Sequence, residues 1–389
     1  MKVGVVGLGY RLEYLVRVFS VLIPDFQLVG YVDPSPAGLP GLRQHGIDPG
    51  QSYESIDALA KAAPLDLLMI GSPNHLHLGH IKTALQLNLK VFCEKPVVIS
   101  EAETYELLRL LHACGDPDRV MVGLVLRYAP LYVDLKKVIA EGALGEIVSI
   151  EASEHIAPYH GAFFMRDWRR YQGYSGSFIL EKCCHDLDLY QGAVGARPQR
   201  VASFGGRKSF VPENAVRHNL DVYHRKPSGW MGTDKVFDSD ADIIDYQTAL
   251  IEYANGATMA FHTNMNVPDQ FRRFCIVGSK GMAEGDFIRN FFKVHDARTS
   301  DVLLDTTYET TELSQHYGAD EQMVKDIAAH LTTGAALPVS VIDALEAGLT
   351  AIKIDEARQS RSVIDLTETW KRFDAARNGE TPPAMARSA

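Results

Sequence analysis

The sequence lacks any apolar run of the length that crosses a membrane, which takes about 20 consecutive apolar residues. We therefore expect no membrane partner. The first residues also lack the charged start and small-residue cleavage site of a secretory signal, because residues 1–6 have the pattern of a buried strand. These two absences predict a cytoplasmic protein.

The chain has fewer positive than negative residues, and it has few cysteines. The chain has 39 lysine and arginine residues against 49 aspartate and glutamate residues, and its net charge is -10. This balance argues against a nucleic-acid partner, because phosphate binding requires clustered positive charge. The 5 cysteines have no spacing typical of a disulfide framework, and their odd count fits a reducing compartment.

Short apolar runs alternate with helix-like segments in the first third of the chain. We expect strands at 3–7, 26–32, 66–70, 91–93 and 120–124. Asn74 is the expected N-cap of the helix after the third of these strands. Strand–helix alternation of this kind predicts an α/β fold with a parallel sheet and helices on both of its faces.

The pattern changes beyond residue 124. Turn signals at 255–256 and 278–281 predict two hairpins and so an antiparallel sheet in an α+β domain. The sequence therefore predicts two domains, 1–124 and 125–389.

A glycine turn follows the first strand. Gly7 permits a tight turn, and Gly9 lets the backbone approach a pyrophosphate. Tyr10 and Arg11 begin the next helix, whose free N–H groups attract an anion. The third glycine of the dinucleotide-binding pattern is replaced by Leu12. The alternative is a tight turn without a ligand.

Asp33 ends the second strand. A carboxylate there accepts hydrogen bonds from the adenosine ribose hydroxyls and repels a 2′-phosphate. The following Pro34 and Ser35 supply no compensating positive charge. We therefore predict that NAD is the cofactor, in preference to NADP. The alternative is that Asp33 only starts a turn before Pro34.

Lys95 follows the strand at 91–93, between Glu94 and Pro96. Ligands of open α/β sheets bind beyond the carboxyl ends of the strands. Lys95 is therefore a candidate donor to a substrate oxygen that gains negative charge. The alternative is a surface ion pair with Glu94.

A second candidate group lies on a predicted helix. The spacing of Glu181, His185 and Asp188 places them on one helix face. Histidine suits proton transfer near neutral pH, and a carboxylate fixes its tautomer. The alternative for His185 is a hydrogen-bonded core histidine.

Structural roles are expected for the residues that lie between Glu181, His185 and Asp188 on this helix. Lys182 and Asp186 have the spacing of a structural ion pair. Cys183 and Cys184 are expected to be small buried residues. A zinc site is a further alternative, but adjacent cysteines point about 100° apart on a helix and no second Cys/His cluster is present. We therefore predict no metal.

Four further residues are candidates for substrate contact. Trp168 and Arg169 precede the helix of His185 and have the character of a sugar-binding pocket, although an exposed loop is the alternative. Arg127 follows the last strand of the first domain, at the domain junction. His316 precedes a helix for which Asp320 is the expected N-cap.

Taken together, these motifs resemble the glucose–fructose oxidoreductase / inositol dehydrogenase (Gfo/Idh/MocA) family. The resemblance covers almost the whole chain. It is carried by residues 4–9, Asp33, 72–77, 94–96 and 142–147, and by the Glu181…His185…Asp188 pattern. The family usually has aspartate where this chain has Glu181.

The resemblance implies an N-terminal Rossmann domain and a C-terminal domain with a large, open, mainly antiparallel sheet that binds substrate and forms a homo-oligomer, a dimer or tetramer. It also implies that a late helix near 340–361 packs back on the first domain. The implied activity is NAD(P)-dependent redox chemistry at a hydroxyl or carbonyl carbon of a sugar, inositol or related polyol.

The resemblance assigns roles to single residues. Lys95 hydrogen-bonds the reacting hydroxyl, and His185 accepts its proton with Glu181 beside it. The implied cofactor contacts outside the glycine turn are Ser72, Pro73, Asn74, His77, Glu94 and Lys95, and Asp188 is an implied substrate contact.

Two other functions remain open. Some relatives of this family use bound NAD transiently to cleave or epimerise glycosidic substrates, and they show no net redox change. A non-catalytic nucleotide sensor would need only Gly7, Gly9 and Asp33. The presence of Lys95 and His185 argues against a sensor, because a sensor needs no proton acceptor.

Overall fold

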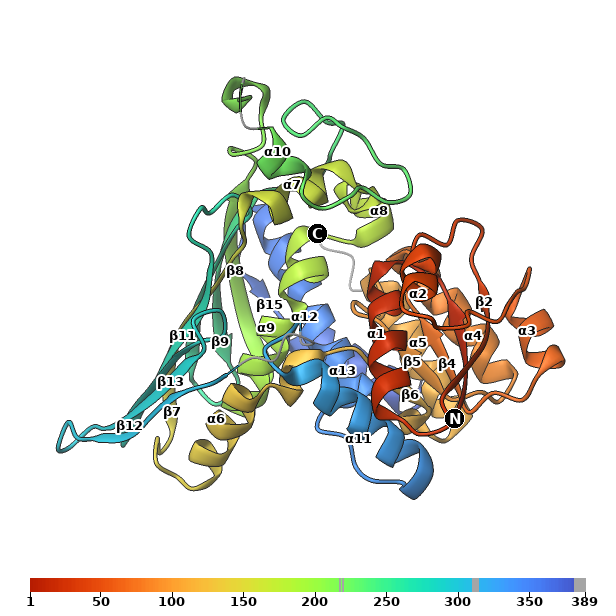
Figure 1. The fold of residues 1–389 in the computed structure, drawn as a ribbon. Coiled ribbons are helices and arrows are strands. Elements are labelled where there is room, and N and C mark those ends of the chain that lie inside the picture. The colour runs from red at the N-terminus through yellow and green to blue at the C-terminus, as the bar shows by residue number, and fades with distance from the viewer. Residues whose placement is uncertain (217, 219, 310–314, 381–389) are drawn as a thin grey trace.

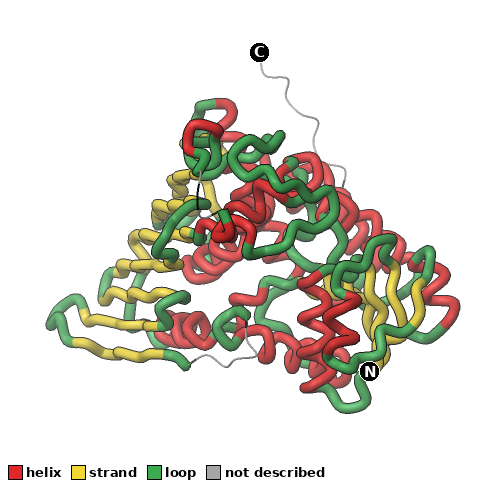
Figure 2. The backbone as a smooth tube through the Cα atoms, turned by 45° about the horizontal axis from the view of Figure 1, so that its top comes forward, coloured by secondary structure: helices red, strands yellow, loops and turns green. Residues whose placement is uncertain are grey.

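Two β-sheets organise the protein. The computed structural model describes residues 1–216, 218, 220–309 and 315–380 (Figure 1). A 6-stranded parallel sheet has the order β3-β2-β1-β4-β5-β6. A 9-stranded sheet has the order β14-β13-β12-β11-β7-β10-β9-β8-β15 and is antiparallel except where β7 pairs with β10. Figure 2 shows the two sheets at opposite sides of the molecule, with helices between them.

The first sheet and its helices form a Rossmann-like unit, as predicted. Its strands are β1 (Lys2–Val6), β2 (Gln27–Val32), β3 (Gln51–Ser52), β4 (Leu67–Ile70), β5 (Val91–Cys93) and β6 (Val120–Val122). Its helices are α1 (Tyr10–Leu22), α2 (Leu39–Gln44), α3 (Ile56–Ala62), α4 (His77–Gln86) and α5 (Glu101–Cys114). Strand β4 is fully buried, which explains its unbroken apolar sequence.

The second sheet contains both predicted hairpins, β9–β10 and β11–β12. Its strands are β7 (Ile147–His155), β8 (Pro198–Gly206), β9 (Tyr246–Tyr253), β10 (Thr258–Asn264), β11 (Phe271–Gly278), β12 (Gly281–Asp286), β13 (Phe291–Asp296), β14 (Val302–Thr307) and β15 (Ile364–Asp365). The helices that follow β6 are α6 (Pro130–Ala140), α7 (Pro158–Arg166), α8 (Gln172–Ser175), α9 (Phe178–Val194), α10 (Asp221–His224), α11 (Ala319–Thr333), α12 (Val341–Ser360) and α13 (Thr367–Arg377).

The large sheet has one covered and one open face. Helices α9 and α12 lie on the side that faces the first sheet (Figure 1). Burial alternates along β9 and β10, so that every second side chain is buried. On the other face, Phe204 is 70% exposed and Leu250 is 51% exposed.

Helix α12 joins the two halves. It packs on α9 and β8, and it also contacts α5 and β6 of the first sheet. Its start is fixed by a capping box, in which Ser340 accepts from the Asp343 N–H and Asp343 accepts from the Ser340 N–H. Within the described part of the chain, no helix combines the length and apolar character needed to cross a bilayer.

Candidate active site

The glycine turn after β1 leaves the start of α1 open. Gly7 has φ +79°, and a Cβ there would lie 2.3 Å from the main-chain nitrogen of Ser72. A Cβ on Gly9 would meet no described protein atom within 4 Å. Gly9 is the N-cap of α1 and makes no side-chain cap hydrogen bond. This bare helix N-terminus, reached across a glycine backbone, fits a pyrophosphate.

Asp33 lies just beyond β2, as expected. Its Oδ1 accepts a hydrogen bond from the Ser35 N–H at 2.7 Å, so it does form the turn that was its alternative role. The side chain remains half-buried rather than enclosed. Holding the turn and meeting a ribose are therefore compatible roles for this carboxylate.

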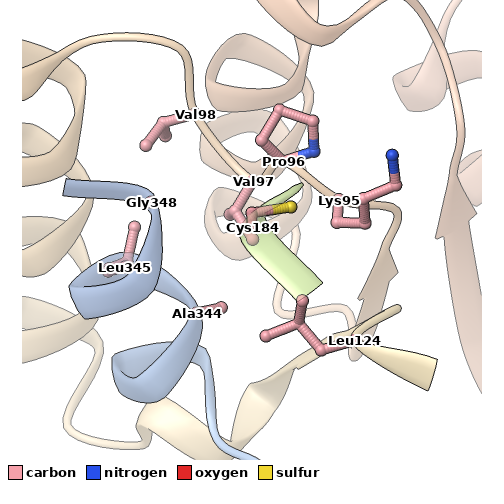
Figure 3. Close-up of a pocket in the computed structure, with 9 residues that line it drawn as sticks. All are labelled: Lys95, Pro96, Val97, Val98, Leu124, Cys184, Ala344, Leu345 and Gly348. Carbon is pink, nitrogen blue, oxygen red and sulfur yellow. The ribbon is translucent and has the colours of Figure 1, made fainter. Parts of the chain in front are cut away.

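Lys95 extends from the end of β5 to α9. Its ammonium donates to the main-chain carbonyl of Glu181 at 2.6 Å and lies 3.6 Å from the Glu181 Oε1. The base of its side chain borders a small cavity with apolar residues of α12 on the far side. Figure 3 shows the Lys95 nitrogen directed away from Ala344 and Leu345. Apolar packing thus holds the stem while the charged end meets the first turn of α9.

Glu181 is a buried carboxylate with three partners. Its Oε2 accepts from Asn74 at 2.6 Å, and its Oε1 accepts from Arg169 at 2.9 Å and faces Lys95. Burial alone would raise the pKa of Glu181, but the charges of Lys95 and Arg169 and the hydrogen bond from Asn74 hold it below its ordinary value. The group is therefore an anion at neutral pH.

The role expected for Asn74 as a helix cap is wrong. Residues Asn74–Leu76 form a 3₁₀ turn, and the Asn74 amide donates to the Ser175 carbonyl and to Glu181. These two acceptors, brought from a distant part of the chain, fix the orientation of the Asn74 amide, and neither the 3₁₀ turn nor α4 has a side-chain cap hydrogen bond. Asn74 therefore ties the segment after β4 to the start of α9.

His185 lies one turn beyond Glu181 on α9 and is 6% exposed. Its Nδ1 is buried and has no hydrogen-bond partner among the described residues. Burial, followed by the charge of Lys95, lowers its pKa well below the ordinary value. The imidazole is therefore neutral at pH 7, which is the form that accepts a proton.

Asp188 does not support His185. Its two carboxylate oxygens each accept a hydrogen bond from Arg127 at 2.7 Å, in a bidentate pair. Both side chains are largely buried. The pair joins α9 to the segment after β6, and it engages two of the five residues that were expected to contact substrate.

The expected pair between Lys182 and Asp186 is wrong. Lys182 meets Glu154 of β7 at 2.8 Å, and Asp186 meets Arg272 of β11 at 2.6 Å. The sheet supplies each helix residue with a buried partner of opposite charge, so the two do not pair along the helix. Cys183 and Cys184 are buried and free, as predicted.

Trp168 and Arg169 lie side by side near Glu181. Trp168 is 6% exposed, and the Arg169 guanidinium carbon is 4.2 Å from its ring centroid. The Trp168 ring is therefore packed inside rather than open to a sugar. Sequence reasoning missed a more exposed aromatic pair, Tyr174 and Trp230, whose centroids are 5.5 Å apart and of which Trp230 is 49% exposed.

Asp320 was expected to be the N-cap of α11, and that expectation is wrong. Gly318 takes that position, and Asp320 is fully buried in the first turn. Its carboxylate accepts from Arg11 at 2.8 Å and lies 3.0 Å from the His316 Nδ1. Arg11 also donates to Glu94 at 2.8 Å. These contacts bring Arg11, Glu94 and His316 together and join α1 and the end of β5 to α11.

The remaining motif residues hold the loops beside the glycine turn. Both ring nitrogens of His77 lie 2.8 Å from main-chain carbonyls, those of Pro96 and Ser72. His77 therefore binds the 72–77 and 94–96 segments to each other. Tyr10, in contrast, is 51% exposed at the start of α1. In the residues that the structure describes, no group of three or more His, Cys, Asp or Glu side chains is arranged to hold a metal ion.

Comparison with curated proteins gives distant relatives. Inositol 2-dehydrogenase of Rhizobium meliloti (strain 1021) is 25% identical over 181 residues, which is 46% of this chain and 51% of the relative. The 2,7-anhydro-N-acetylneuraminate hydratase of Escherichia coli (strain K12) is 26% identical over 203 residues, 52% of each protein. The chain thus spans about half the length of these two relatives.

Solved structures share the fold over nearly the whole chain. Scyllo-inositol dehydrogenase from Lactobacillus casei, with bound NAD(H) and scyllo-inositol, has a TM-score of 0.73 at 19% identity and covers 94% of this chain and 99% of its own. A levoglucosan dehydrogenase complex with NADH and L-sorbose has a TM-score of 0.75 at 19% identity, with 94% and 98% covered.

Two family models account for most of the sequence. Residues 1–123 match the NAD-binding Rossmann fold of an oxidoreductase family, and residues 136–366 match the C-terminal alpha/beta domain of the same family. The first match agrees with the glycine turn and the parallel sheet described above. The chain is a member of the Gfo/Idh/MocA family of NAD-binding oxidoreductases.

Proposed function

We propose that this protein is an NAD-dependent dehydrogenase or reductase that acts on a hydroxyl or carbonyl carbon of a sugar, inositol or related polyol. The observation that carries the proposal is the meeting of Lys95 with the first turn of α9, one turn before a buried, neutral His185. The distant relatives and structural neighbours named above, which include inositol dehydrogenases and a complex with L-sorbose, support the same substrate class.

The cofactor site combines residues of the glycine turn with those that follow β2 and β4. Gly7, Gly9 and Asp33 hold the dinucleotide, and residues 72–74 line its path towards Lys95. Bound NAD+ supplies the hydride acceptor. The carboxylate of Asp33 favours NAD over NADP, because a 2′-phosphate brings a second negative charge beside it.

The chain's own residues handle the proton and the oxygen. His185 accepts the proton of the substrate hydroxyl at a ring nitrogen, for which its lowered pKa keeps it in the neutral form. Lys95 donates a hydrogen bond to the same oxygen and stabilises its developing negative charge. Glu181 acts through Lys95 and Asn74 by positioning them, rather than by exchanging a proton. In the reducing direction the same groups return the proton.

A second candidate function is a reaction that uses the same residues and bound NAD but produces no net redox change. The similarity to a 2,7-anhydro-N-acetylneuraminate hydratase favours it, because the name of that relative describes a hydratase rather than a dehydrogenase. An enzyme of this kind, or one that cleaves or epimerises glycosides, would consume substrate while no NADH accumulates.

A panel of sugars and polyols separates these functions. Each compound is incubated with NAD+ or NADP+, reduced nicotinamide is followed by absorbance, and products are identified by mass spectrometry. We expect NADH formation with at least one compound and a higher kcat/KM with NAD+ than with NADP+. Product without NADH would support the second candidate. Cofactor binding without any turnover would support a non-catalytic nucleotide sensor. A preference for NADP+ would refute the role of Asp33 in favouring NAD.

We also propose a division of labour within the chain. Residues 1–124 bind the cofactor, and 125–389 bind substrate and form a homo-oligomer through the open face of the large sheet. The exposed apolar side chains of Phe204 and Leu250 lie on this face and would be covered in such an interface. Light scattering should give a dimer or tetramer for the wild type and a smaller species for Phe204→Glu. A monomeric wild type would refute the oligomer.

A further inference from the structure

Lys226 is a partly buried lysine in the segment between α10 and β9, which passes beside α7 and α8 (Figure 1). Its ammonium nitrogen is 5.5 Å from the ring centroid of Phe163 and 5.9 Å from that of Tyr159, both on α7. Aromatic faces attract a cation but do not neutralise it. No carboxylate forms an ion pair with Lys226 in the described ranges, and the side chains whose charges act on it are all cations.

The cations of the candidate active site differ from Lys226 because each has a carboxylate partner. Three of them, Lys95, Arg169 and Lys182, lie close enough for their charges to act on Lys226. The ion pairs are Lys95 with Glu181 at 3.6 Å, Arg169 with Glu181 at 2.9 Å and with Asp167 at 2.8 Å, and Lys182 with Glu154 at 2.8 Å. Among the described residues, the group of Lys95, Arg169, Lys182 and Lys226 therefore has one ammonium without a counter-charge, that of Lys226.

The groups around the Lys226 ammonium do not neutralise its charge. Burial, followed by the charges of Lys182 and Arg169, lowers the pKa of Lys226 to about 8, so that the ammonium form still dominates at neutral pH. His160 on α7 is half-buried near the same cations, and desolvation keeps its pKa well below the ordinary value, so it is neutral. A half-buried cation without a partner is costly, and an anion that binds beside it removes the cost.

We propose that Lys226 binds a carboxylate group of the substrate, so that the substrate is a sugar acid rather than a neutral polyol. This inference rests on the proposed function, since it names the substrate class of the same site. A single surplus ammonium matches one carboxylate, whereas a phosphate dianion would carry twice the charge. Lys226 and Arg169 both lie near the Phe163 ring, at 5.5 Å and 5.3 Å from its centroid, and Arg169 pairs with Glu181, which faces Lys95. The proposed carboxylate would therefore bind on the side of the candidate active site where Lys95 meets the reacting hydroxyl.

Matched sugars test the proposal. The kcat/KM is measured with NAD+ for D-glucuronate against D-glucose, for D-galacturonate against D-galactose, and for D-glucose 6-phosphate. We expect at least one uronate to exceed its neutral counterpart by about tenfold or more, as for a charge-assisted hydrogen bond. Lys226→Met should reduce that ratio by about tenfold or more through KM, and Lys226→Arg should retain most of it.

The control is Lys235→Met, which removes an exposed lysine from the same segment and should leave the ratio as in the wild type. Equal kcat/KM for acids and neutral sugars would overturn the proposal, as would an unchanged ratio in Lys226→Met. A preference for the phosphate over both uronates would overturn the assignment to a carboxylate.

Binding of the uronates, measured by titration calorimetry with NADH present, separates this proposal from the proposed function. Uronate binding that is lost in Lys226→Met, without oxidation of any sugar, would support the carboxylate site and refute the redox function. Oxidation of neutral sugars without any preference for acids would refute the carboxylate site alone. Failure of every uronate both to bind and to react would also refute it.

Discussion

The ammonium nitrogen of Lys95 lies 2.6 Å from the main-chain carbonyl oxygen of Glu181, and this hydrogen bond joins the end of β5 to the helix that carries His185. The two residues are 86 positions apart in the sequence. The proposed chemistry depends on this junction, because the cofactor turn belongs to the first sheet and the proton acceptor belongs to α9.

Gly9→Ala should weaken NADH binding with little effect on stability, whereas Gly7→Ala should destabilise the fold. In Gly9→Ala, the new methyl group meets no described protein atom, so the melting temperature should stay near that of the wild type. The methyl group would occupy the surface proposed for the pyrophosphate, and the Kd for NADH should rise about tenfold or more. Calorimetry and NADH fluorescence titration measure the two quantities.

Gly7→Ala is the matched comparison. The new Cβ would lie 2.3 Å from the Ser72 nitrogen at φ +79°, so the variant should lose roughly 1–3 kcal/mol of unfolding free energy. Wild-type NADH affinity in Gly9→Ala would show that the dinucleotide binds elsewhere.

Glu181→Gln tests a positioning role. The substitution keeps the shape of the side chain but removes the anion that faces Arg169 and Lys95, so the free energy of unfolding should fall by about 3 kcal/mol. Because Lys95 loses a partner, kcat should fall roughly 10- to 100-fold with a smaller change in KM. Glu181→Asp retains the charge and should recover most of kcat. Wild-type turnover in Glu181→Gln together with a loss in the shorter Glu181→Asp would indicate that Glu181 contributes only packing.

The Arg11–Asp320 ion pair should make stability depend on pH. Burial raises the pKa of Asp320, but the charge of Arg11 and the contact with His316 hold it well below the ordinary value. Its stabilisation is therefore complete above about pH 4, the ordinary pKa of aspartate, and is lost as the pH falls towards the folded-state pKa. Asp320→Asn should lower the unfolding free energy by roughly 3 kcal/mol at pH 7.

Urea unfolding at pH 7 and at pH 3 measures this dependence. The difference between wild type and Asp320→Asn should be smaller at pH 3 than at pH 7. The exposed Asp238→Asn serves as the control and should match the wild type at both values. A difference that is independent of pH would contradict a stabilising role for this ion pair.

Five of the six strands of the first sheet, the two hairpins and the glycine turn were predictable because each leaves a local pattern of apolar spacing or turn residues, whereas β3, β8, β13, β14 and β15 were not predicted. The partners of polar residues were not. Local spacing paired Lys182 with Asp186, but the pattern carries no information about Glu154 and Arg272, which the large sheet brings to α9. The same limit applies to Asn74, for which a helix cap was the nearest local role although its partners lie more than 100 positions away.

Lys226 left no sequence signal at all. It belongs to no motif and lies in an irregular segment. Its proposed role follows from its lack of a carboxylate partner, since the carboxylates nearby pair with Lys95, Arg169 and Lys182. An unpaired charge of this kind can be recognised only in the folded structure, where the segments that carry the neighbouring charges lie together.

The most direct test of the central claim is turnover by Lys95→Met and His185→Asn, measured with the best substrate of the sugar and polyol panel at saturating NAD+. Each variant should bind NADH as the wild type does and lose roughly 100-fold or more in kcat, because one has lost the donor to the reacting oxygen and the other its proton acceptor. Turnover close to that of the wild type in both variants would contradict the account.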